Sequence, residues 1–124
     1  MDRLARMNLV TVEGVTVARI DGDIDISNAQ ELGDALTASM SNDSLGLVVD
    51  LGALDYLDSS GVHLLLGLNG RLRARRQQLR AVAPADAPLR AVLEITAADK
   101  TVPVDERVED AVNAIRDRAT GSAA

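Results

Sequence analysis

The chain lacks cysteine, tryptophan and phenylalanine, and Tyr56 is its only aromatic residue. Without cysteine there can be neither disulfide bonds nor thiolate metal ligands, and one histidine, His63, cannot supply a multi-histidine metal centre. The scarcity of aromatic side chains also excludes the stacking platforms that bind single-stranded nucleic acid. The core must therefore consist of leucine, valine, isoleucine and alanine.

The chain also lacks an excess of positive charge and a long apolar run. Its 124 residues hold 13 lysine and arginine residues against 19 aspartate and glutamate residues, which gives a formal net charge of −6. This balance argues against nucleic acid or an anionic membrane as the main partner. No apolar run approaches the length of a membrane span, and the first ten residues do not form a signal peptide. We expect one cytoplasmic domain, residues 1–124.

Strand and helix patterns alternate along the chain after an opening hairpin. Met7–Val12 and Val15–Asp21 are alternating runs separated by Glu13 and Gly14, which predicts a tight hairpin. The remaining predicted strands are Leu45–Leu51, Leu79–Ala83 and Thr101–Val104. Helical spacing predicts helices over 29–40, 61–76 and 108–119. Another helix is expected to open at Asp86–Ala87–Pro88, with Leu89, Val92 and Leu93 on its apolar face. The order β-β-α-β-α-β-α-β-α indicates the α/β class, a mixed β-sheet with flanking helices.

Local signals refine this prediction. Leu45–Leu51 is continuously apolar, as in a strand that is buried on both faces between parallel neighbours. Acidic residues and Gly22 in 21–25 predict a loop, and Ser27 or Asn28 is expected to cap the following helix. The apolar positions of the central strand and of two helices predict a buried set: Leu47, Val48, Val49, Leu65, Leu66, Val112 and Ile115.

The centre of the chain is the segment between the buried strand and the helix that follows it. An acidic loop containing Asp55 and Asp58 leads to two adjacent hydroxyls, Ser59 and Ser60, at the start of an apolar helix. A helix start has unpaired N–H groups and the positive end of the helix dipole. It favours serine or aspartate as a cap, and it can also hold a phosphate group. The segment is therefore either a plain helix cap or a hydroxyl presented for phosphorylation.

Other chemistry has weaker support. A serine nucleophile needs a base, and His63 lies four residues after Ser59, but the Gly-x-Ser-x-Gly elbow of hydrolases is absent. Carboxylates that follow strands could share a magnesium ion, although solvated loop residues are the favoured interpretation: Asp23, Asp25, Asp55 and Asp58. Glycine-rich phosphate-binding motifs are absent. We therefore predict no enzyme activity, no cofactor and no metal.

Four segments together resemble a known family: Gly22–Asp23–Ile24–Asp25, Val48–Val49–Asp50–Leu51, Tyr56–Leu57–Asp58–Ser59–Ser60–Gly61 and Leu89–Arg90–Ala91–Val92–Leu93–Glu94–Ile95–Thr96. They are similar to the STAS domain, and in particular to the stand-alone anti-sigma factor antagonists (anti-anti-sigma factors) of bacteria. The resemblance covers residues 7–118 and departs from the family pattern at His63, at Gln77–Gln78 and at Ala97–Ala98–Asp99.

The resemblance implies a function in transcription regulation by partner switching. It implies binding to an anti-sigma factor that is also a serine kinase of the GHKL type, so that a sigma factor is released. That kinase, which binds the ATP, phosphorylates Ser59 and so prevents binding, and a serine phosphatase restores it. In the resemblance, Asp25 matches the acidic loop residue of the family and Asp58 the aspartate of the motif. The residues that we predict to bind the partner are Asp23, Asp25, Asp58, Ser59, Ser60, Gly61, Val62 and His63. The alternative is a STAS subunit of a lipid-transport or sensor complex that is never phosphorylated.

Overall fold

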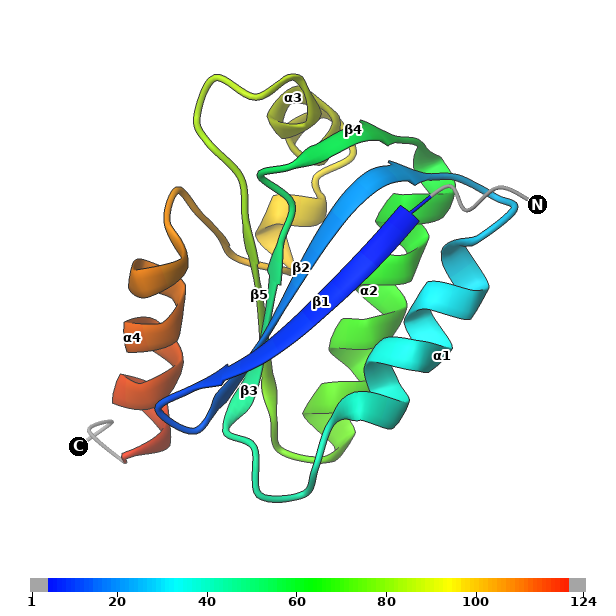
Figure 1. Cartoon of the computed structure of the whole chain (residues 1–124). Helices are drawn as coiled ribbons and strands as arrows, with labels where there is room; N and C mark the ends of the chain where they lie inside the picture. The colour runs from blue at the N-terminus through cyan, green and yellow to red at the C-terminus, as the bar shows by residue number, and fades with distance from the viewer. Residues whose placement is uncertain (1–4, 121–124) are drawn as a thin grey trace.

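The computed structural model describes residues 5–120, which form one mixed sheet with helices on both faces (Figure 1). The strands are β1 (Ala5–Val12), β2 (Val15–Ile24), β3 (Gly46–Asp50), β4 (Leu54–Leu57), β5 (Gln78–Val82) and β6 (Val104–Asp105). The helices are α1 (Ala29–Ser39), α2 (Ser59–Ala74), α3 (Pro88–Ile95) and α4 (Val108–Ala119), with a 3-10 turn at Ala98–Lys100. The ends of the predicted domain, residues 1–4 and 121–124, lie outside the described residues.

The sheet has the strand order β1-β2-β3-β5-β6, and β4 pairs with β2. The hairpin strands β1 and β2 are antiparallel, with Val12 opposite Val15. All other pairings are parallel, as the alternation of strands and helices predicts. The α/β class with a mixed sheet is confirmed, and so is the buried position of β3 between two parallel neighbours.

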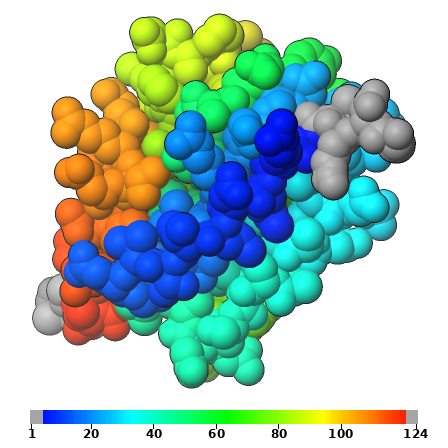
Figure 2. All heavy atoms as spheres, viewed as in Figure 1, coloured from blue at the N-terminus to red at the C-terminus, as the bar shows by residue number. Residues whose placement is uncertain are grey.

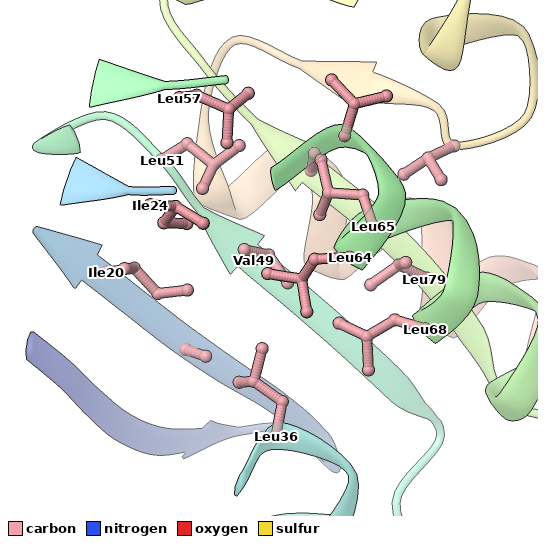
Figure 3. Close-up of a cluster of buried hydrophobic side chains, with 14 of the residues drawn as sticks. Ile20, Ile24, Leu36, Val49, Leu51, Leu57, Leu64, Leu65, Leu68 and Leu79 are labelled. Carbon is pink, nitrogen blue, oxygen red and sulfur yellow. The ribbon is translucent and has the colours of Figure 1, made fainter. Parts of the chain in front are cut away.

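The two faces of the sheet bury separate sets of aliphatic side chains. Helices α1 and α2 cover one face and α4 covers the other (Figure 1). On the first face, side chains of α2 meet those of the strands, and Leu64 and Leu68 point toward Val49 and Leu79 (Figure 3). The predicted core is confirmed, except that Leu66 is only partly buried, because it packs at the margin of the cluster.

Strand β4 is an element that the sequence pattern does not reveal. Its segment was expected to be an acidic loop, but Leu54–Leu57 pairs with the end of β2. The register shifts there, so that Gly22 is opposite Leu54 and Asp23 is opposite Tyr56, and Asp55 has no opposite residue. Because of this bulge the two buried leucines of β4 are three positions apart, not two, and the alternation typical of a strand is lost.

The end of β2 was also expected to be a loop, and this prediction is wrong for 22–24. After four residues that pair with β3, β2 continues and pairs with β4 instead. Gly22 has φ +97°, a conformation that glycine adopts without the steric cost of a side chain. The sheet therefore extends to Ile24 and Leu57, and this extension positions the candidate site.

The hairpin strand β1 forms one edge of the sheet. Figure 2 shows its side chains on the surface between α1 and α4, and Leu9 and Val10 are exposed there.

Within residues 5–120, no helix has both the length and the apolar character needed to cross a lipid bilayer.

Candidate functional site at the carboxyl ends of strands β2 and β4

Asp25 and Asp58 follow directly after two neighbouring parallel strands. Ile24 of β2 and Leu57 of β4 are register partners, and the backbone N–H of Asp58 donates to the carbonyl oxygen of Ile24 at 3.3 Å. Both carboxylates therefore leave the sheet at the same edge. The structure thus brings together two acidic residues that are 33 positions apart in the sequence (58 − 25).

Asp58 is the residue that caps α2. Its Oδ1 accepts hydrogen bonds from the backbone N–H of Ser60 at 2.8 Å and of Gly61 at 3.4 Å, which satisfies two of the donors that a helix start leaves open. The serines were considered as caps, and this interpretation is wrong, because Ser59 is already the first helical residue. Its side chain is exposed, whereas Ser60 is half-buried, and neither hydroxyl makes a hydrogen bond to a described residue.

Gly61 allows this helix start to lie close against the ends of the two strands. A Cβ atom at this position would be 2.9 Å from Cγ of Leu57 and 3.2 Å from Cγ2 of Ile24. Such contacts are closer than side-chain packing permits, so any larger residue would push α2 away from the sheet. The glycine of the motif is therefore a packing requirement that fixes where Ser59 is presented.

Asp25 organises the turn between β2 and α1. Its Oδ1 accepts hydrogen bonds from the Ser27 hydroxyl at 2.6 Å and from the Ser27 backbone N–H at 2.8 Å. These two bonds, with the hydroxyl contributing more, hold the pKa of the Asp25 carboxyl below its ordinary value. Asn28 is the cap residue of α1, one of the two that were expected, but its side chain makes no cap bond to the helix. Its Oδ1 accepts from the backbone N–H of Asp25, and its Nδ2 donates to the carbonyl oxygen of Asp23.

A groove between α1 and α2 begins beside the serines. It has a volume of about 340 Å³, and Ser60 and His63 contribute to its wall. Ile26, which also lines the groove, is 84% exposed. Ile26 was not among the predicted site residues, although a large aliphatic residue between two polar ones, in the turn after Asp25, is a signal that the sequence carries. An exposed apolar residue beside polar groups is a feature of surfaces that contact proteins.

The other predicted site residues fall into two groups. Asp23 is partly exposed, and both His63 and Asp55 are exposed, Asp55 on β4. In contrast, Gly61 and Val62 are buried against the core, so the expectation that they contact a partner needs correction: their role is to pack the helix.

The two chemical alternatives have no geometry to support them. Residues 5–120 contain no group of three or more acidic or histidine side chains arranged to hold a metal ion. No hydrogen bond joins His63 to Ser59 in this part of the chain. The edge of the sheet therefore presents an accessible hydroxyl, two ordered carboxylates and an adjacent groove, which suits recognition by another protein.

Comparison with known proteins agrees with this arrangement. The model of the STAS domain family matches residues 6–111. The chain belongs to the STAS domain family. The putative anti-sigma factor antagonist BtrV of Bordetella bronchiseptica is 27% identical over 111 residues, which cover 90% of this chain and 95% of BtrV. This STAS chain is thus similar to an anti-sigma factor antagonist over most of its length.

Solved structures give the same result. An anti-sigma factor antagonist from Mycobacterium paratuberculosis superposes with a TM-score of 0.80 at 30% identity, covering 91% of this chain and 95% of that one. The antagonist SpoIIAA in its unphosphorylated form gives a TM-score of 0.71 at 21% identity, with 94% and 97% covered, and shows the fold alone. Anti-sigma factor antagonists are non-enzymatic STAS proteins.

Proposed function

We propose that this STAS chain is an anti-sigma factor antagonist whose binding is switched off by phosphorylation of Ser59. The observation that carries the proposal is the accessible Ser59 hydroxyl at the first position of α2, next to a cap that Asp58 provides. The partner is an anti-sigma factor that is also a serine kinase of the GHKL type. Its binding releases a sigma factor, and a serine phosphatase reverses the modification.

Ser59 suits a switch because the helix does not depend on its side chain. The backbone N–H groups of Ser60 and Gly61 donate the cap hydrogen bonds to Asp58, so a phosphate on Ser59 leaves these bonds in place. Phosphorylation adds a charge of about −1.5 to −2 at neutral pH. The helix dipole stabilises negative charge at this end, and we expect the modified chain to remain folded.

The same charge weakens binding because of where it lies. Asp58 and Asp25 already place carboxylates at this edge of the sheet, and Ile26, Ser60 and the exposed His63 border the groove beside it. A partner that fits the unmodified surface would meet added bulk and repulsion at its centre. Like charges brought together at an interface are costly, and they act on affinity and on partner choice.

The test is a titration of the candidate anti-sigma kinase against four forms of the chain. We expect Ser59→Ala to bind as the wild type does and to resist phosphorylation, and Ser59→Asp to bind about 5- to 150-fold more weakly, the range of a typical coupling free energy. Ser41→Asp adds the same charge on an exposed loop residue at the other end of the sheet, and it should bind as the wild type does. Mass spectrometry locates the phosphate.

Two results would contradict the switch. Equal affinity of wild type, Ser59→Ala and Ser59→Asp would show that the Ser59 surface is not at the interface. A phosphate found only on Ser60 or elsewhere would assign the modification to another residue. Binding of a partner that never phosphorylates the chain would favour the alternative, a STAS subunit of a lipid-transport or sensor complex.

A further inference from the structure

The groove between α1 and α2 has an apolar floor and a length of about three helical turns. Figure 1 shows the two helices side by side on one face of the sheet. Along α2 the lining begins at Ser60 and ends at Arg71, a span of 11 positions (71 − 60), which is about 17 Å at 1.5 Å per residue. The buried lining residues are all small or aliphatic: Ala29, Gly33, Leu64 and Leu68. The groove is therefore long enough and apolar enough to hold three turns of another helix.

Two glycines shape the groove. A Cβ atom at Gly33 would lie 2.7 Å from Cδ1 of Leu64, so glycine allows α1 to approach Leu64 closely at the floor. Gly67, in contrast, is exposed and lines the groove, and a Cβ atom there would meet no neighbouring atom within 4 Å. Helix propensity disfavours glycine within a helix, yet here it leaves a gap in the wall that no described side chain fills.

Ile26 is held at the rim of the groove by an ordered turn. Its side chain is exposed, and hydrogen bonds fix the residues on both sides of it. The Asp25 carboxylate accepts from the backbone N–H of Ser27 at 2.8 Å, and the backbone N–H of Asp25 donates to Asn28 Oδ1 at 3.0 Å. Removing exposed aliphatic surface from water is favourable, and a contact that is ordered before binding loses little entropy. Ile26 is therefore a preformed contact for an apolar surface.

The polar groups around the groove favour an uncharged occupant. Arg71 lies at one end, but its Nη1 is 3.5 Å from Asp34 Oδ1 and donates to Thr37 Oγ1 at 3.0 Å, so its charge is already balanced. Within residues 5–120, the buried side-chain atoms without a hydrogen-bond partner belong to Asp21 and Gln77, and neither residue lines the groove. An apolar surface therefore complements the groove better than a charged or strongly polar small molecule does.

We propose that the groove receives an amphipathic helix of the anti-sigma factor kinase, whose aliphatic side chains pack between α1 and α2 and fill the gap at Gly67. The proposal rests on the function proposed above, because the groove is continuous with the switch: Ser60 lines it, and Ser59 begins the same helix. An apolar helix face in a groove is a recurrent mode of recognition. The groove supplies affinity for the kinase, and phosphorylation of Ser59 at its end opposes that binding.

Gly67→Leu tests the proposal because it fills the groove from the exposed side of α2. Gly70→Leu is the matched control: Gly70 is exposed on the same helix, a Cβ atom there also meets no neighbouring atom within 4 Å, and it does not line the groove. Both variants gain helix propensity, so both should remain folded, which urea unfolding checks. In calorimetric titration with the candidate kinase, Gly67→Leu should bind about 10- to 100-fold more weakly and Gly70→Leu within about twofold of the wild type.

The phosphorylation reaction gives a second measurement, which a merely structural defect would not reproduce. If the groove docks the kinase, Gly67→Leu should raise the KM of the chain as a substrate and leave kcat unchanged, because Ser59 itself is intact. Ile26→Ala should raise KM about 3- to 10-fold through the loss of a contact at the rim. Gly70→Leu should leave both constants unchanged.

The outcomes separate the groove from the switch. Equal affinity of the wild type and Gly67→Leu, in an experiment in which Ser59→Asp weakens binding, would overturn the groove proposal alone. Equal weakening by Gly67→Leu and Gly70→Leu would also overturn it, because the effect would then not depend on the groove. A wild-type dimer that Gly67→Leu abolishes would assign the groove to a second copy of the chain and refute the proposal. If the wild type does not bind the kinase at all, the proposed function fails, and this proposal fails with it.

Discussion

Replacing Gly61 by alanine tests the packing that positions the site. A Cβ atom there would lie 2.9 Å from Leu57 Cγ and 3.2 Å from Ile24 Cγ2. Leu57 and Ile24 are themselves buried, at 6% and 1% exposure, so neither side chain can move away into solvent. Either the two core residues change rotamer or the start of α2 moves outward.

The magnitude follows from comparison with a second glycine of the same helix. A Cβ at Gly70 would meet no atom within 4 Å, and Gly70 is exposed, so Gly70→Ala should stabilise the chain by up to about 1 kcal/mol through helix propensity. Gly61→Ala gains at most the same amount and bears an overpacking cost of about 1–3 kcal/mol. The two variants should therefore differ by about 1–3 kcal/mol, with Gly61→Ala the less stable.

The assay is unfolding by urea, followed by circular dichroism. The unfolding midpoints give the difference in free energy if the slope m is the same for both variants. In a thermal scan the same difference corresponds to about 4 °C per kcal/mol for a chain of this size. If Gly61→Ala proved as stable as Gly70→Ala, the close approach of α2 to Leu57 would not exist, and the placement of Ser59 derived from it would be wrong.

Three further predictions concern the core, the turn before α1 and the end of α2. Leu65→Ala should destabilise the chain by about 2–5 kcal/mol in urea unfolding, because Leu65 is 2% exposed within the main core; a loss below 1 kcal/mol would contradict that packing. Ser27→Ala should raise the pKa of Asp25 toward 3.8, as measured by carbon-13 NMR titration of its carboxyl group. Because the folded pKa is lowered, the stability linked to Asp25 is present above the unfolded pKa and is lost as the pH falls through the folded pKa. The Ser27→Ala variant should therefore lose less folding stability than the wild type when the pH is lowered. An unchanged titration of Asp25 in the variant would show that the hydroxyl bond is absent. Arg76→Gly should stabilise the chain by about 0.5–1 kcal/mol, because φ +61° disfavours arginine, and a destabilised variant would refute this account.

The sequence predicted the elements whose signals are local. The hairpin at Glu13–Gly14 and the helix that begins at Pro88 were predicted because turn residues mark the first and a proline in the first helical turn marks the second. Strand β4 could not be predicted, because its pairing depends on a bulge opposite Gly22, 32 positions earlier (54 − 22). A non-local partner sets the spacing of its buried residues, and no pattern within the segment records this.

The candidate site was likewise predicted where its signals are local and missed where they depend on distant parts of the chain. The motif predicted the importance of Ser59 and its neighbours, but it did not predict which residue caps the helix. Aspartate and serine are equally good caps, and only the geometry of the folded chain selects Asp58. The position of Asp25 beside Asp58 follows from β2–β4 pairing, which the sequence pattern did not show.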